Sequence, residues 1–130
     1  MAIQRFEDIR AWQEARLLTK QVYTITKAGA GLRRDRRLRE QMQAAAVSIM
    51  SNIAEGFSRR TAKEFIQFLF VAKGSVAEVE SLLYVAFDQE YVGKDDFAAL
   101  YQKCEEVARI TSGFITSLLP RSGTRRRNGR

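Results

Sequence analysis

The sequence predicts an all-α protein and, within that class, an antiparallel up-down-up-down four-helix bundle. Three observations lead to this prediction. Apolar residues recur at alternating steps of three and four along four long segments, as they do on one face of an α-helix. The connections between these segments are short, and no segment with the period-two pattern of a strand is left over. A repeat near 3.5 residues also favours helices that cross at about 20°.

The first two helices are predicted over about residues 9–28 and from Asp35 to about Gly56. The apolar stripe of the first consists of Ala11, Ala15, Leu18, Val22 and Ile25. Glycines 29 and 31 interrupt that pattern. Asp35 is suited to cap the second helix, whose stripe contains Met42, Ala45, Ala46, Ile49 and Ile53. Gly56 lies where such a helix commonly ends.

The third and fourth helices are predicted from a capping box and from a proline. Thr61-Ala62-Lys63-Glu64 is a capping box, in which two end groups satisfy each other's backbone donors. The stripe that follows is Phe65, Leu69, Ala72, Val76, Val79, Leu83 and Ala86. After a short connection at residues 90–94, the fourth stripe runs from Phe97 to Leu118, and Pro120 stops it. Asp95 and Asp96 place negative charge at the N-terminus of that helix.

The composition bounds the domain and excludes several classes of chemistry. The chain has 130 residues, 45% of them apolar, which is enough for one domain, predicted over residues 1–120. Residues 121–130 contain five arginines and no apolar residue, so we expect a disordered basic tail. One cysteine and no histidine exclude a disulfide framework, a Cys-based zinc site and His-dependent catalysis within one chain. No cofactor or metal is expected.

The distribution of charge indicates the kind of partner. The net charge is +7, yet residues 33–63 carry eight basic and three acidic residues, whereas residues 64–120 carry four basic and nine acidic residues. Such asymmetry indicates either an anionic partner or charge-matched self-association. No apolar run reaches the ~20 residues of a membrane span, and no signal-peptide pattern is present. We therefore expect a soluble, cytoplasmic protein.

Two longer motifs carry a resemblance to a known family. Residues 45–59 contain the run Asn52-Ile53-Ala54-Glu55-Gly56, and residues 64–80 begin Glu64-Phe65-Ile66-Gln67-Phe68-Leu69. Together with Phe6-Glu7-Asp8-Ile9 and Ala11-Trp12-Gln13-Glu14-Ala15, these motifs resemble the four helix bundle protein family over roughly residues 6–119. That family includes proteins encoded within 23S rRNA intervening sequences. The resemblance implies a small cytosolic bundle that assembles as a ring-like homopentamer.

The same resemblance also implies a role with nucleic acid, partly through distant similarity to the accessory protein of diversity-generating retroelements. It supplies no catalytic residues. From the residues themselves, the candidate nucleic-acid-binding side chains are Arg33, Arg34, Arg36, Arg37, Arg39, Arg59, Arg60 and Lys63. Arginine matches phosphate oxygens bidentately, so these clusters fit RNA or DNA. A solvated surface and ion pairs with a neighbouring subunit are the alternatives. Without a recognised reading module, binding would be sensitive to salt.

An exposed apolar patch is the candidate oligomer interface. Seven of residues 65–72 are apolar, so they cover nearly the whole circumference of the third helix. One core-facing stripe leaves Ile66, Phe70 and Val71 on another face. A monomer would expose them, and monomers rarely leave such a patch bare. We therefore expect this patch to form a subunit interface, and the resemblance makes a pentamer the specific expectation.

Four other features have a structural and a functional interpretation. Ser48, Asn52 and Glu55 form a polar line, either a hydrogen-bonded seam between helices or a contact for a ligand or subunit. Gly74 lies within a helix, where glycine is unfavourable, so we expect close packing against Ala44–Ala46, or else a hinge or a ligand contact. Cys104 lies in an apolar stripe and is expected to be a buried, unreactive thiol. Glu105 and Glu106 fit a solvated face.

These observations favour a non-enzymatic, homo-oligomeric four-helix bundle with a nucleic-acid-binding role. The alternative is a structural or accessory scaffold subunit for a protein partner, without nucleic-acid binding. Neither interpretation involves a membrane or a small-molecule substrate.

Overall fold

Every regular element of the protein is helical within residues 2–120, the part that the computed structural model describes. The all-α class is thereby confirmed. Four helices are long, and the elements are η1 (Phe6–Asp8), α1 (Arg10–Ala28), α2 (Ala30–Arg34), α3 (Arg36–Phe57), α4 (Ala62–Asp88) and α5 (Lys94–Leu118). The predicted tail at residues 121–130 lies outside the described residues. No helix in residues 2–120 is both long and apolar enough to cross a membrane.

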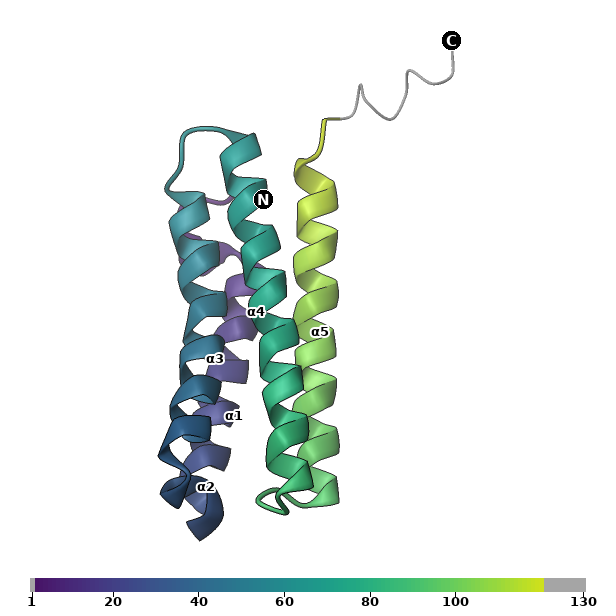
Figure 1. Cartoon of the computed structure of the whole chain (residues 1–130). Helices are drawn as coiled ribbons and strands as arrows, with labels where there is room; N and C mark the ends of the chain where they lie inside the picture. Colours follow the sequence, from purple (N-terminus) through teal and green to yellow (C-terminus); the bar gives the residue numbers. More distant parts are fainter. Residues whose placement is uncertain (1, 121–130) are drawn as a thin grey trace.

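The four long helices lie side by side (Figure 1). α1 and α4 each pack against both α3 and α5, so α1 and α4 lie diagonally across the core from each other. Leu18, Ile49, Leu83 and Val107, one from each long helix, are fully buried between them. Figure 1 shows α2 and the α4–α5 connection at one end, here called the lower end. The α3–α4 connection lies at the opposite, upper end.

The helix starts follow the predicted caps. Asp35 precedes α3, and its Oδ1 accepts a hydrogen bond from the Leu38 N–H at 3.2 Å. Thr61 precedes α4, and its Oγ1 accepts from the Glu64 N–H at 3.1 Å. The Thr61 N–H makes no hydrogen bond to the Glu64 carboxylate, so only half of the predicted capping box forms. α3 ends at Phe57, one residue beyond Gly56.

The short helix α2 was not predicted from the sequence. Glycine 29 ends α1 as expected, but the chain becomes helical again at Ala30 because Leu32 is buried in the core. Gly31 lets Tyr91 approach, since a Cβ at this position would overlap the Tyr91 ring. Tyr91 Oη then donates to Asp35 Oδ2 at 3.1 Å. The start of α3 is thereby connected to the α4–α5 connection.

The predicted packing of Gly74 against the alanines of α3 is wrong within this chain. Gly74 is exposed, and a Cβ built on it would meet no atom within 4 Å. The buried Ala46 faces α1 instead, where its carbonyl accepts from Thr19 Oγ1 at 3.2 Å. The residue of α4 that faces α3 is Ser75, one position further along the helix.

The polar line on α3 forms a seam with α4 at two of its three positions. Ser48 and Ser75 share a hydrogen bond of 2.9 Å between their hydroxyls. Asn52 Nδ2 donates to Ser48 Oγ at 3.0 Å. Glu55 lies outside this network and forms an ion pair with Arg59 at 3.1 Å. The seam fixes how α3 and α4 align along their length.

Candidate nucleic-acid interface and subunit surface

Five of the predicted arginines lie together at the lower end of the protein. Arg33 and Arg34 end α2, and Arg36, Arg37 and Arg39 lie in the first turn of α3. Burial of Leu32 and Leu38 orients the short turn between them, which leaves the arginines outside. All are exposed except Arg39, which is half-buried. They form the lower arginine cluster.

Within residues 2–120, two of the five arginines of the lower arginine cluster have a hydrogen-bond or ion-pair partner. Arg36 Nε forms an ion pair with Glu40 Oε2 at 3.0 Å, and both side chains are largely exposed. Arg39 donates to the backbone carbonyl of Arg33. Arg33, Arg34 and Arg37 form no salt bridge within residues 2–120. These three guanidinium groups keep the donor geometry that matches phosphate oxygens.

Arg59, Arg60 and Lys63 lie at the other end of α3 and the start of α4, and are called the upper basic cluster. All three are exposed. Arg59 bonds Glu55 and also lies over the Phe68 ring, 4.7 Å from its centroid. The 22 residues of α3 separate the two clusters, so the structure does not bring the eight predicted side chains together. They form two sites rather than one.

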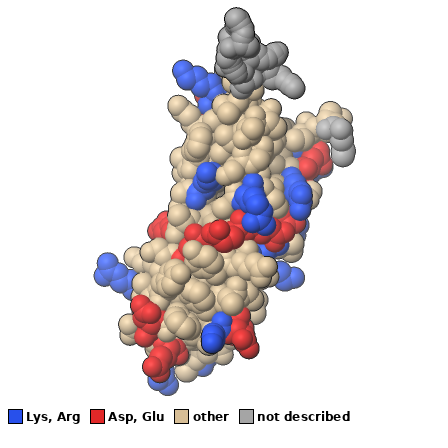
Figure 2. Space-filling model, turned by 90° about the vertical axis from the view of Figure 1, so that its right-hand side faces the viewer, with Lys and Arg blue, Asp and Glu red and all other residues tan. Residues whose placement is uncertain are grey.

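Acidic side chains limit how far a basic surface extends. The bond between Tyr91 and Asp35 places the α4–α5 connection, with Asp88 and Glu90 beside it, near the lower arginine cluster. Figure 2 shows the right-hand face of Figure 1, where red acidic side chains form a band between blue basic ones. This face therefore carries mixed charge, and it has no continuous basic surface.

The predicted subunit surface is exposed at two of its three residues. Phe70 is 55% exposed and Val71 is 54% exposed. Ile66 is half-buried and packs against the core, so it is not bare as predicted. Ile66 and Phe70 line an apolar groove of about 490 Å³ with Leu118 and Leu119. The prediction omitted Tyr84 and Val85, which extend the exposed apolar surface along α4.

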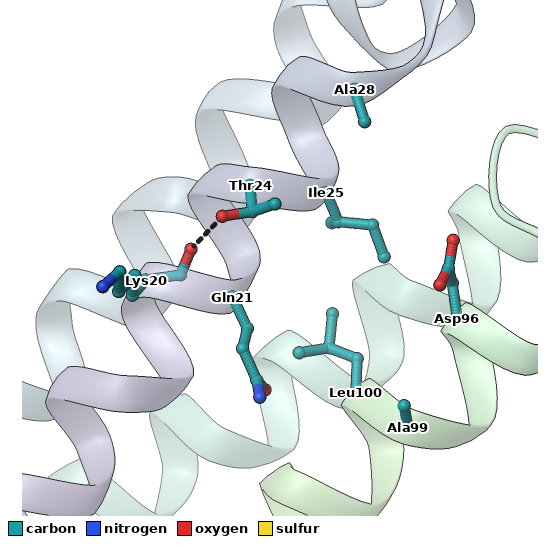
Figure 3. Close-up of a pocket in the computed structure, with 8 residues that line it drawn as sticks. All are labelled: Lys20, Gln21, Thr24, Ile25, Ala28, Asp96, Ala99 and Leu100. Carbon is teal, nitrogen blue, oxygen red and sulfur yellow. Dashed lines mark hydrogen bonds between the residues drawn. The ribbon is translucent and has the colours of Figure 1, made fainter.

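A further pocket of about 380 Å³ lies between α1 and α5 (Figure 3). The Thr24 hydroxyl is not a free donor in this pocket, because it donates a hydrogen bond to the Lys20 carbonyl at 3.0 Å. Lys20 and Asp96 are its charged lining residues, and Ile25 and Leu100 lie between them. Within residues 2–120, no group of three or more His, Cys, Asp or Glu side chains could hold a metal ion.

Two partly buried polar arrangements could not be predicted from the sequence. Lys103 reaches from α5 to Glu14 on α1 and to Glu106 at 3.2 Å, so Glu106 belongs to an ion-pair network rather than to a solvated face. Glu80 of α4 lies beside Glu105 of α5, and burial, followed by the neighbouring carboxyl group of Glu105, raises the pKa of Glu80 to about 7. No sequence signal identifies either arrangement, since each depends on which helices become neighbours.

The single thiol agrees with its predicted role. Cys104 is fully buried in α5. Burial, with smaller effects from the charges of Glu80 and Glu105, raises the pKa of Cys104 to about 12. A thiol in this state is a poor nucleophile at neutral pH, because the thiolate is the reactive form.

Comparison with known proteins agrees with the resemblance noted in the sequence. Residues 7–113 match the model of a family described as 23S rRNA-intervening sequence protein. A crystal structure of a protein of unknown function from the S23 ribosomal protein family of Bacteroides thetaiotaomicron is similar, with a TM-score of 0.72 and 18% sequence identity. The similarity covers 81% of this chain and 97% of that chain. At this identity it shows the fold alone. No curated protein sequence matches the chain.

Proposed function

Because the chain belongs to the 23S rRNA-intervening sequence protein family, we propose that it is a homo-oligomeric helical bundle that binds nucleic acid. In this proposal the long helices form an antiparallel up-down-up-down bundle, and the assembly is a pentamer. The protein acts in the cytoplasm as a binding protein rather than an enzyme, and needs no cofactor or small-molecule substrate.

The observation that carries the binding proposal is the lower arginine cluster. Arg33, Arg34 and Arg37 are exposed and form no salt bridge within residues 2–120. Phosphate contacts by such side chains fix position but do not read sequence, so RNA and DNA of many sequences fit. The upper basic cluster supplies a second, weaker contact, since Arg59 is already engaged by Glu55.

Oligomerisation strengthens this binding without any new contact. Each copy adds one lower arginine cluster to the assembly, and contacts made by linked sites add through effective concentration. The exposed Phe70 and Val71 support self-association, because a monomer would leave both in water. Light scattering on the full chain at micromolar concentration is expected to give the mass of a pentamer. A monomeric mass would reject the oligomer.

The binding test compares two variants that lose the same number of charges. One carries Arg33→Gln, Arg34→Gln, Arg36→Gln and Arg37→Gln, and the control carries Arg10→Gln, Lys73→Gln, Lys94→Gln and Arg109→Gln. Affinity for RNA and for DNA is measured near physiological ionic strength, because any protein of net charge +7 binds at low salt. We expect the cluster variant to bind at least about tenfold more weakly than the control.

Two outcomes would contradict nucleic-acid binding at this site. The first is a wild type without affinity at physiological salt. The second is an equal loss of affinity in the two variants, which would identify a general charge effect. Circular dichroism on both variants checks that the helices remain folded. Either outcome leaves the scaffold interpretation, in which the partner is a protein.

A further inference from the structure

The outer side of α4 is apolar along much of its length. Phe70, Val71, Tyr84 and Val85 are all exposed large hydrophobic residues. Gly74 and Ala77 lie between Phe70 and Tyr84 and are also exposed, so the line from Phe70 to Tyr84 has small residues at its centre. The exposed Glu78 lies seven residues from both Val71 and Val85, at the edge of this surface. Small residues at the centre of a helix face allow another helix to approach closely. The six residues other than Glu78 are called the α4 face.

A second and different apolar surface lies on α1. Leu17 is 48% exposed, and it lines a groove of about 720 Å³ together with Trp12 of α1 and Met50 of α3. Arg16 and Lys20 lie along the same groove. We call it the α1 groove. Because α1 and α4 do not pack against each other, and the α1 groove includes Met50 of α3, the α1 groove and the α4 face lie on different sides of the protein.

The two surfaces lie at the same height along the bundle. Thr19 of α1 bonds the Ala46 carbonyl, and Ser48, two residues further along α3, bonds Ser75 of α4. Leu17 lies two residues before Thr19 in α1. Val71 lies four residues before Ser75 in α4. With a rise of 1.5 Å per residue, Leu17 and Val71 are therefore within about 10 Å of each other in height. A rotation about an axis parallel to the helices can bring such surfaces together.

The charges on the two helices are complementary. α1 carries four basic residues and one acidic residue, whereas α4 carries two basic and four acidic residues. Lys20 beside the α1 groove and Glu78 beside the α4 face form no salt bridge within residues 2–120. Pairing two α4 faces would instead bring acidic helices together. A second copy of this chain, presenting α1, is the better partner.

We infer that the α4 face of one copy docks on the α1 groove of the next, an inference that rests on the proposed oligomer. The contact joins two different surfaces, so it is heterologous: each copy uses its α4 face once and its α1 groove once. Contacts of this kind form a closed ring when the rotation between copies closes. The occupant of the α4 face is thus α1 of a second copy, and α4 does not pack on α4.

Thiol cross-linking distinguishes the two arrangements. Leu17→Cys and Val71→Cys are made singly and together in the full chain, and each protein is treated with a short bis-maleimide. We expect the double variant to give a ladder of covalent dimers, trimers and larger species, and each single variant to remain uncross-linked. Wild type is the blank, because its one thiol, Cys104, is fully buried. A matched control combines Leu17→Cys with Gln102→Cys, an exposed position on α5, and is expected to give no ladder.

The outcomes separate this inference from the proposal on which it rests. Light scattering on each variant before cross-linking reports the assembly. A monomeric wild type rejects the oligomer itself. An oligomer in which Val71→Cys alone forms covalent dimers shows that α4 packs on α4 and overturns the head-to-tail contact. An oligomer in which the double variant gives no more ladder than the Gln102 control also overturns it.

Discussion

At the scale of single residues, the carboxyl group of Glu80 lies in an environment that disfavours its charged form. Its Oε2 is buried and has no hydrogen-bond partner among residues 2–120. Glu105 is its acidic neighbour. The charge of Glu80 raises the pKa of Tyr101, and burial, followed by the charge of Glu80, raises the pKa of Cys104. The folded protein therefore favours a proton on Glu80, with a pKa of about 7 in place of 4.5. Between these values the folded state binds more protons than the unfolded state, so stability falls as the pH rises.

Glu80→Gln should remove much of this pH dependence. Glutamine keeps the shape of the glutamate side chain and is neutral at every pH. Glu80 is itself mostly protonated in the folded protein at pH 5, so the variant and wild type should be about equally stable there. At pH 8 the variant should be more stable by about 1 kcal/mol, a value reduced for solvent screening of the pair. Urea unfolding at both pH values measures this difference. Glu78→Gln, on the exposed side of the same helix, is the matched control and should retain the wild-type pH dependence. Identical pH profiles for wild type and Glu80→Gln would disprove the argument.

At the scale of the helices, α3 and α4 approach each other closely at Gly56. A Cβ on Gly56 would lie 2.6 Å from Phe68 Cβ and 2.8 Å from Phe65 Cδ1. Because the first of these atoms is fixed to the backbone of α4, the helices would have to move apart. This explains in physical terms why the run Asn52–Gly56 ends in glycine.

Gly56→Ala should therefore destabilise the protein, by about 1–3 kcal/mol, through overpacking. Gly113→Ala provides the opposite case. Gly113 is exposed within α5, and a Cβ there would meet no atom within 4 Å, so alanine should stabilise the protein by up to about 1 kcal/mol through its higher helix propensity. Thermal or urea unfolding of both variants tests the pair. Equal effects of the two substitutions would show that the approach of α3 to α4 is not as close as described.

The sequence predicted the helices well because the core imposes a period on each of them. Leu18, Ile49, Leu83 and Val107 all lie in predicted stripes, and all are buried. Features that depend on which helices become neighbours could not be predicted in this way. Glycine is unfavourable within a helix, which predicts a packed position for Gly74, yet Gly74 is exposed and its neighbour Ser75 faces α3. The Glu80–Glu105 pair belongs to the same class, since only the packing of α4 on α5 brings these carboxyl groups together.

For the candidate site, the sequence identified the arginines but could not determine their arrangement. Runs of charge are visible in any sequence, whereas the separation of the lower arginine cluster from the upper basic cluster follows from the length of α3. The position of Tyr91 next to Asp35 brings acidic residues of the α4–α5 connection to the same end as the arginines. Asp35 and Tyr91 are 56 positions apart in the chain, so no local sequence pattern predicts their contact.

At the scale of the whole molecule, attraction to nucleic acid has two sources that differ in kind. The folded part holds the lower arginine cluster, and residues 121–130 add five arginines and no acidic residue. Five of the seven net positive charges of the chain therefore belong to those ten residues. Charge that contacts phosphate releases counterions, and each contact steepens the dependence of affinity on salt.

Removal of residues 121–130 should therefore make the salt dependence of binding shallower. If all five arginines contact duplex DNA, the slope of log affinity against log salt should fall by about 4–5 per chain, from a loss of about 0.9 for each phosphate contact. Fluorescence anisotropy across a salt series, on the full chain and on a chain ending at Pro120, measures the two slopes. A full-length variant with the five arginines replaced by glutamine keeps the length of the chain and should match the truncated form. Equal slopes for all three proteins would show that the folded clusters alone contact the nucleic acid.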